Sequence, residues 1–269
     1  MTRSTPAALG PTARVRRLNW AKLSLALQVL AVLVAFLVLW EVLSRTEVID
    51  PRIFSSPTLI WDMWWVLLDR GLIWPHLWET TRHLLWAFVL FTVVAGVLGV
   101  VLGMRQYTFE VFYSPIAIFF AFPKVTLYPI FLIAFGLGAQ SKILFGALFG
   151  FFPLVMNTMV GVREVRRLHL DLMRSIGAGP LFKFFRLLLP ATLPSFATGL
   201  RIGFVYAGIG ILLAEMFAAV RGLGNRIIAA GYQGTLDQFW VYVVLSSLLL
   251  LAGAGFFRIL ELRLSRWRP

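Results

Sequence analysis

Polar and ionisable side chains inside long apolar segments are the residues of this sequence whose types could do chemistry. Lys124 directly follows Pro123 in one apolar segment, Asn157 lies deep in the next, and Glu215 lies near the end of a later one. A charge near the middle of a bilayer costs about 2.5–3.5 kcal/mol, so it normally has a partner or lines water. Lys124 is therefore either a pore-lining positive site for an anionic solute or a structural group, in a buried pair or as a cap on carbonyls at the proline break. Asn157 and Glu215 also have two interpretations: solute contact, or a structural partner, which for Glu215 would be a loop arginine.

The sequence contains no pattern of residues that is typical of a catalytic site or a metal site. His76, His83 and His169 show no HExxH spacing, and there are no cysteines to act as co-ligands. We expect His76 and His83 to reach toward the outer headgroups, and Arg201 to reach toward headgroup phosphate. No GxxxxGK[ST] loop is present, so another subunit must supply any nucleotide energy. The chain is predicted to bind no metal or cofactor.

A basic segment over 161–201 interrupts the otherwise apolar chain. Gly177 and Ala178 form a turn that ends one short helix, because glycine permits the left-handed conformation. Pro180 starts a second helix, and Leu189 with Pro190 is predicted to end it. The cations of this segment that lie between the two apolar spans are Arg163, Arg166, Arg167, Arg174, Lys183 and Arg186. Two short helices with a hinge between them are shaped to be gripped by a partner on the cytoplasmic side.

The composition places the chain in a membrane. Of its 269 residues 59% are hydrophobic and only 14% are charged, which excludes an ordinary soluble domain. The net charge of +13 invites a nucleic-acid interpretation. The basic residues cluster at the ends of apolar segments, however, as the positive-inside rule expects, so nucleic-acid binding is excluded. The absence of cysteine rules out disulfides and leaves the compartment open.

Hydropathy predicts an all-α protein with six membrane spans of roughly 20 residues each. Residues 1–22 form a cytoplasmic tail, disordered over 1–19, and residues 261–269 form a second one. The first span is long enough to be a retained anchor rather than a cleaved signal. The core of the membrane protein is expected over 82–260, with the basic loop at 163–190. The predicted spans are 23–43, 82–104, 114–135, 141–162, 194–220 and 239–260.

Local patterns add three expectations. Most lysines and arginines fall on one side of these spans, which places both termini in the cytoplasm. Residues 56–78 carry tryptophans at helical spacing and are predicted to form an outer helix, lying either on lipid or on the protein itself. The glycines at 96, 99 and 103 predict close helix approach, and Pro115, Pro123 and Pro129 predict a kinked or unwound third span.

The basic segment resembles the cytoplasmic "EAA" loop of permease subunits of ATP-binding-cassette importers, whose pattern is E-A-A-x-x-x-G-A followed by I-x-L-P. Asp171 stands for the glutamate, and Leu172 and Met173 stand for the two alanines. Further segments, such as FPKVTLYPIFLIAFGLGAQSKI and LPATLPSFATGLRIG, are similar to the nitrate/sulfonate/taurine branch. The residues that the resemblance assigns to ATPase coupling are Asp171, Leu172, Met173, Ser175, Gly177, Ala178, Phe182, Leu189 and Pro190.

The resemblance implies a six-span permease in the bacterial inner membrane that pairs with a second copy around a central pore. Two ATPase subunits, which bind ATP and Mg²⁺, would grip the loop, and a periplasmic or lipoprotein substrate-binding protein would deliver the solute. The substrate would be a small anion or organic acid, and its pathway would include Lys124, Pro123, Asn157 and Glu215. The alternatives are a gradient-driven transporter or channel, which needs intramembrane carboxylates beyond Glu215, and a membrane enzyme, which needs a polar catalytic cluster.

Overall fold

The computed structural model shows a helical protein. Within the described residues every regular element is a helix, which confirms the all-α class. The chain forms two units, Met1–Asp62 and Met63–Pro269. Side chains are described from residue 27 onward, and the backbone is described for residues 11–46, 48, 54–165, 173, 175 and 177–264.

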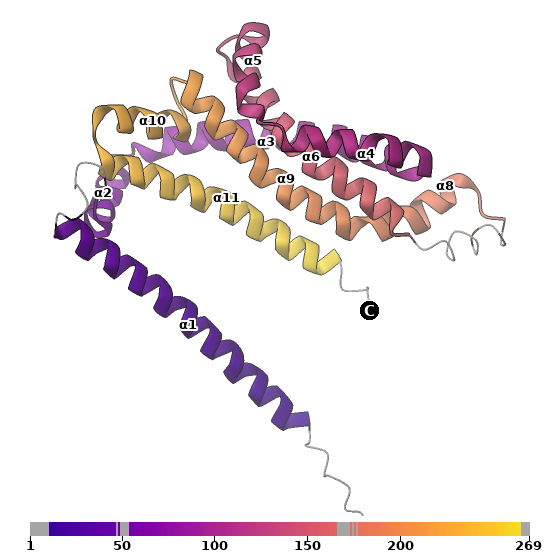
Figure 1. Ribbon diagram of the computed structural model, residues 1–269, viewed down its shortest axis with the longest axis horizontal. Helices are drawn as coiled ribbons and strands as arrows, with labels where there is room; N and C mark the ends of the chain where they lie inside the picture. The colour runs from indigo at the N-terminus through magenta and orange to yellow at the C-terminus, as the bar shows by residue number, and fades with distance from the viewer. Residues whose placement is uncertain are drawn as a thin grey trace, which may run out of the picture. The chain divides into compact units, whose positions relative to one another are not determined.

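Five helices of the described chain have the length and apolar character of membrane spans, and a bent pair of shorter helices makes a sixth when it is counted as one span (Figure 1). These segments match the six predicted spans in number and order. The single helices are α1 (Pro11–Arg45), α3 (Ile73–Met104), α6 (Ala139–Arg163), α9 (Leu189–Ala218) and α11 (Leu236–Leu264). The bent pair is α4 (Gln106–Ala121) followed by η1 (Lys124–Leu127) and α5 (Tyr128–Phe135).

Several predicted boundaries are wrong. Helix α1 begins at Pro11, so the disordered tail expected over 1–19 does not extend that far; proline suits the first position of a helix. The outer helix expected over 56–78 is shorter, since α2 (Pro57–Asp69) ends at Asp69. Gly71, at φ +66°, ends it with hydrogen bonds from Gly71 N–H to Leu68 O and from Leu72 N–H to Leu67 O. Residues 73–81 therefore belong to α3 rather than to the outer helix.

Within the first unit, the end of α1 holds the start of α2. The Glu41 carboxylate accepts hydrogen bonds from the Thr58 backbone N–H (3.1 Å) and from the Thr58 hydroxyl (2.8 Å). A carboxylate at this position satisfies a backbone donor in the first turn of a helix and interacts favourably with the helix dipole. Trp61 and Trp65 stand exposed on α2, and their placement at a lipid headgroup layer stays a prediction.

The third span is broken, as its prolines predicted. Helix α4 ends at Ala121, and the chain resumes in η1 after Pro123, with an 83° bend between the two parts. Pro123 lacks the N–H that would continue the helix, and proline disfavours a helical conformation in the residue before it. Pro115 stays inside α4, and Pro129 lies in the first turn of α5, where its missing donor costs nothing.

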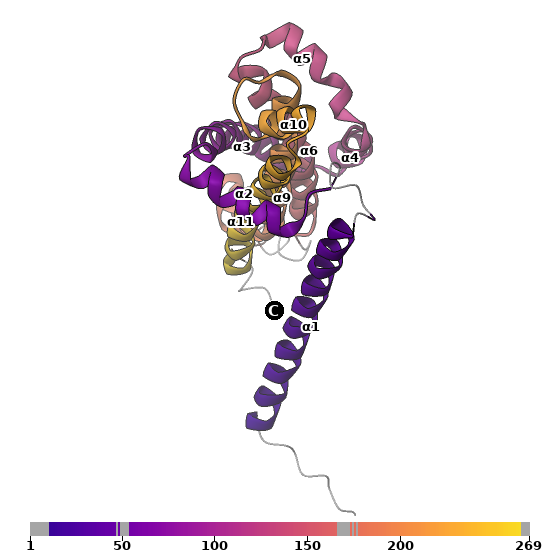
Figure 2. The same cartoon turned by 90° about the vertical axis from the view of Figure 1, so that its left-hand side faces the viewer.

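The larger unit is organised around two central helices. Helix α6 packs against α9, and α3 packs against both. Helices α4 and α5 pack on α6, whereas α11 and α10 (Leu223–Gln233) pack on α9 (Figure 2). The broken span and the last span thus contact different central helices.

Glycine allows the central helices to approach closely. A Cβ atom on Gly99 would lie 2.5 Å from Thr158 Cβ on α6, and one on Gly103 would lie 2.9 Å from Val162 Cβ. Such distances are below normal contact, so any larger residue would separate α3 from α6. The close approach predicted from the small-residue stripe is confirmed for this pair of helices.

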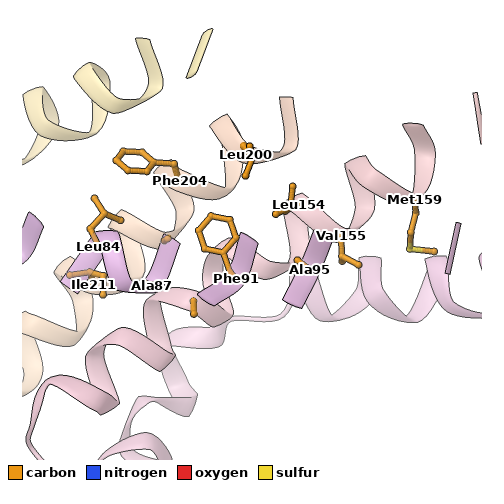
Figure 3. Close-up of a cluster of buried hydrophobic side chains, with 12 residues drawn as sticks. Leu84, Ala87, Phe91, Ala95, Leu154, Val155, Met159, Leu200, Phe204 and Ile211 are labelled. Atoms are coloured by element: carbon orange, nitrogen blue, oxygen red, sulfur yellow. The ribbon is translucent and has the colours of Figure 1, made fainter. Parts of the chain in front are cut away.

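The apolar core lies where α3, α6 and α9 meet. Phe91 from α3 is buried among side chains of α6 and α9, including Leu154 and Leu200 (Figure 3). Its ring occupies space that Cβ atoms on Gly150 and Gly203 would fill, at 2.6 and 2.9 Å. Because these three helices pack so closely, they form a rigid core, and the other helices of this unit pack around it.

Candidate functional site

One candidate site is the basic segment that leaves α6. Gly177 has a φ of +66°, and the Ala178 N–H donates to Met173 O at 3.0 Å. This six-to-one hydrogen bond around a left-handed glycine is the helix-ending turn predicted from the sequence, and it is confirmed. Asp171 and Leu172 lie outside the described residues. Ser175 is exposed beside the turn.

The second half of the segment differs from the prediction. Pro180 starts helix α8 (Pro180–Lys183) as expected, but Leu189 and Pro190 do not end a helix. The chain passes through a turn of π-helix, η2 (Phe184–Leu188), directly into α9. The wider turn bonds Leu189 N–H to Phe184 O, and Pro190 follows in the first turn of α9, where its missing donor is tolerated. The segment is therefore continuous with the fifth span.

This arrangement leaves apolar side chains exposed beside the turn. Leu181, Phe182 and Phe185 are half or more exposed, with Phe182 at 50%. An amphipathic segment with exposed aromatic anchors is the form in which a helix binds a groove of a partner protein. Because α8, η2 and α9 are continuous, a force on these anchors would act directly on the fifth span.

The base of the segment is tied to two neighbouring helices. The Arg163 guanidinium at the end of α6 lies 5.4 Å from the centre of the Phe109 ring on α4. The Ser195 hydroxyl on α9 donates to the Glu164 carboxylate at 3.3 Å. A cation over an aromatic ring and a charge-assisted hydrogen bond thus connect the end of α6 to both α4 and α9.

The break in the third span holds Lys124. Its ammonium group donates to Phe120 O at 2.7 Å, and the residue is 6% exposed. The rings of Phe120, Phe149 and Phe152 have their centres 5.1–5.3 Å from the nitrogen. Within one chain, Lys124 therefore caps a carbonyl at the proline break, as one of the two interpretations proposed. A role in binding solute stays a prediction.

Asn157 and Arg201 also have partners within the protein. The Asn157 amide donates to Pro153 O at 2.7 Å, which satisfies a carbonyl one turn earlier on α6. Arg201 does not reach for headgroup phosphate as expected. Its guanidinium pairs with Glu261 on α11 at 3.0 Å, and the same carboxylate accepts the Thr198 hydroxyl at 2.7 Å. The pair gives each charge a partner within the protein, although the two side chains stay 30% and 24% exposed.

Glu215 is the centre of a buried polar cluster. It is completely buried, and its carboxylate accepts hydrogen bonds from the Thr80 hydroxyl (2.7 Å) and from Gly224 N–H (3.1 Å). His83 Nδ1 lies 3.2 Å from the other carboxylate oxygen. The expectation that Glu215 pairs with a loop arginine is wrong, as is the expectation that His83 reaches the headgroups. The histidine is 1% exposed, because α3 carries it against α9.

The turn before α10 completes this cluster. Gly222 has a φ of +125°, and a Cβ atom there would lie 2.4 Å from the Glu215 carboxyl carbon. Leu223 N–H donates to the Thr80 hydroxyl at 2.8 Å, and Gly222 N–H donates to His76 Nδ1 at 3.2 Å. The carboxylate therefore sits at the N-terminus of α10, where free backbone donors favour an anion.

The four residues predicted for the solute pathway have separate hydrogen-bond partners. Lys124 and Pro123 lie together at the break, Asn157 bonds within its own helix α6, and Glu215 bonds to Thr80 on α3. Their place on one solute pathway stays a prediction. The sequence analysis missed Thr80, although a signal was present. Thr80 and His83 are spaced i, i+3 and thus share one face of α3, which must be covered if it is polar.

The chain matches a family model described as "Binding-protein-dependent transport system inner membrane component" over residues 95–266. It is 30% identical to the formylaminopyrimidine transport permease protein ThiX of Halalkalibacterium halodurans, over 86% of this chain and 92% of that protein. It is 27% identical to the taurine transport system permease protein TauC of Escherichia coli, over 94% of each. The fold is similar to a chain of the inward-facing MetNI methionine ABC transporter, with a TM-score of 0.56 and 21% identity over 78% of this chain and all of that one.

Proposed function

The chain belongs to the family of binding-protein-dependent transport inner membrane components and is a permease subunit of an ATP-binding-cassette importer; we propose that two copies pair around the solute pathway. Each copy contributes the face of its broken third span. Both termini lie in the cytoplasm, and a binding protein delivers solute from the other side. ATP and Mg²⁺ bind to two separate ATPase subunits.

The exposed break in the third span is the observation that carries this proposal. Phe122, Pro123 and Thr126 are exposed, and the backbone here leaves the α-helical pattern at an 83° bend. Irregular backbone at membrane depth has N–H and C=O groups that lipid cannot bond, so it occurs only where it is buried in protein or faces water. If two copies pair at this face, each break is covered by the other copy and also faces a water-filled pathway between them.

Crosslinking tests the pairing directly. The chain contains no cysteine, so each single-cysteine variant has no thiol background. Thr126→Cys is expected to give a covalent dimer when membranes containing the importer are treated with a short bifunctional thiol reagent. The matched control is Ser247→Cys, an exposed hydroxyl residue on α11, which should stay monomeric. A dimer from the control but not from Thr126→Cys would place the pairing face elsewhere.

An anionic solute fits the charge of this face. Two copies bring two Lys124 residues near the axis, where their mutual repulsion falls when an anion lies between them. Lys124 donates one hydrogen bond, to Phe120 O, although an ammonium group has three donors, so donors are left for a solute once the ring of Phe120 or Phe152 turns aside. We therefore assign the substrate to small organic or inorganic solutes that carry an anionic group, the class that includes taurine and other sulfonates.

Lys124→Ala is expected to lower uptake of the anionic solute by at least about tenfold, because opposite charges 4 Å apart interact by about 4 kcal/mol at an effective dielectric of 20. Uptake is measured per assembled complex in vesicles with the ATPase and binding protein. Lys142→Ala is the matched control, since Lys142 is equally buried and also caps carbonyls, those of Leu137 and Gly138. Equal uptake by the two variants would refute the solute role.

Coupling to the ATPase is assigned to the segment over 163–190. Its exposed anchors, Phe182 and Phe185, are suited to a groove of the ATPase, and the continuous helix through η2 carries movement into α9. The links from Arg163 to α4 and from Glu164 to α9 would move the same helices together. Closure of the ATPase would thereby switch the pathway between its two sides.

A further inference from the structure

An apolar groove on the outside of the larger unit lies between α3 and the start of α9. It encloses about 550 Å³, and one side of it is the valine face of α3, with Val93, Val97 and Val101. The other side is formed by Phe184 of η2 and by Phe196 of α9. These walls expose almost no polar atoms, so water gains nothing by entering.

The floor of the groove is dry for a specific reason. Gly96 has no side chain there, and a Cβ atom would approach the Phe196 ring to 3.1 Å. Two of the three threonines of the lining, Thr158 and Thr192, donate their hydroxyls at 2.7 Å to carbonyls of their own helices, Leu154 O and Leu188 O. Their methyl groups are left to line the groove. The third, Thr92, has a buried hydroxyl without a hydrogen-bond partner among the described residues.

The length of the groove matches one leaflet of a bilayer. Lining residues recur on α3 from Thr92 to Met104. Twelve residues of α-helix rise about 18 Å, and one leaflet contributes about 15 Å of hydrocarbon. A single acyl chain that lies along α3 would therefore fill the groove from the headgroup layer to the middle of the bilayer.

Cations flank the end of the groove at Met104 and Phe184. Arg105 directly follows the lining residue Met104 and is exposed. Lys183 and Arg186 flank Phe184 on the opposite wall. At the other end, near Thr92 and Val93, the next cation along α9 is Arg201, whose charge is paired with Glu261 on α11. An apolar channel of leaflet length with positive charge at its mouth is complementary to an anionic phospholipid.

We propose that this groove binds one anionic phospholipid per chain, with its acyl chain along α3 and its phosphate beside Arg105 and Lys183. The bound lipid stiffens η2, because Phe184 and Leu188 form part of the groove wall. Any effect on nucleotide hydrolysis rests on the proposed coupling role of this segment, whereas the binding itself does not.

Native mass spectrometry of the delipidated full-length permease, titrated with phosphatidylglycerol or phosphatidylcholine, tests the site. The expected result is one tightly bound phosphatidylglycerol per chain and weaker binding of phosphatidylcholine. Val97→Trp should weaken phosphatidylglycerol binding by about tenfold, since an indole displaces at least two methylene groups. The matched control, Val89→Trp, places the same ring on an exposed position of α3 outside the groove, at 53% exposure compared with 60%.

A second pair of variants keeps the proposal testable if tryptophan disturbs folding. Arg105→Gln should weaken phosphatidylglycerol about fivefold and leave phosphatidylcholine unchanged, because a cation near the surface contributes about 1 kcal/mol toward anionic lipid. Arg258→Gln, another exposed arginine at the end of a span, should change neither lipid. The proposal is overturned if no lipid binds or if phosphatidylglycerol and phosphatidylcholine bind equally. It is also overturned if Val97→Trp separates paired chains and leaves lipid binding unchanged, because a second copy of the chain would then fill the groove.

Discussion

Gly177→Asp should stop solute uptake while the permease still inserts and assembles. Gly177 adopts a φ of +66°, and a residue with a Cβ pays about 1–2 kcal/mol in this left-handed region. That penalty lowers the population of the native turn by about tenfold. The side chain itself fits among the described residues, none of which has an atom within 4 Å of a Cβ at this position. The loss should therefore arise from the direction of the chain rather than from misfolding.

The measurement is uptake and nucleotide hydrolysis by the reconstituted importer, with and without loaded binding protein. We expect hydrolysis without binding protein to persist and its stimulation to be lost. Gly179→Asp is the matched control, because Gly179 also faces open space but has no left-handed φ, and aspartate suits the position before Pro180 at the start of a helix. Normal uptake and stimulation in Gly177→Asp would contradict the coupling role of this turn.

Glu215→Ala should have the largest effect on stability. The substitution leaves the Gly224 N–H and the Thr80 hydroxyl without their acceptor and His83 without its carboxylate. Removing one member of a buried charged cluster typically costs about 3–5 kcal/mol. For a chain of this size, that corresponds to a fall in the melting temperature of about 10 °C. Thermal unfolding of the detergent-purified permease, followed by far-UV circular dichroism, measures this fall.

Two further variants identify the cause of that loss. Glu110→Ala removes an exposed carboxylate that pairs only locally, with Gln106 on the same helix, and should change stability by less than about 0.5 kcal/mol. Gly222→Ala should reproduce the loss, because its Cβ would lie 2.4 Å from the Glu215 carboxyl carbon at a φ of +125°. If Glu215→Ala and Glu110→Ala melt at the same temperature, the cluster does not hold α3, α9 and α10 together.

The two substitutions are expected to affect different properties of the protein, because Gly177 is exposed whereas Glu215 is buried. The coupling turn at Gly177 is local and exposed, so its variant tests transport with little effect on folding. The cluster at Glu215 is buried and joins elements far apart in the chain, so its variant tests folding first. The two predictions can therefore fail independently.

The sequence by itself determined the features that depend on neighbouring residues along the chain. Six apolar segments predict six spans because burial of a segment in lipid depends on its own composition. The break at Pro123 and the left-handed turn at Gly177 follow from the sterics of proline and glycine, which act whatever surrounds them. The family resemblance was also visible at this level, since it rests on the order of short motifs.

Only the tertiary structure decided which groups meet across helices. Glu215 and Thr80 are separated by 135 residues, and no local pattern identifies one as the partner of the other. The rings around Lys124 come in part from α6, and the partner of Arg201 comes from α11. Even the predicted stop at Pro190 failed, because a π turn accommodated the missing donor. A residue specifies its own backbone preferences, whereas its partners are chosen by how whole helices pack, and glycines such as Gly99 and Gly203 determine how closely they do so.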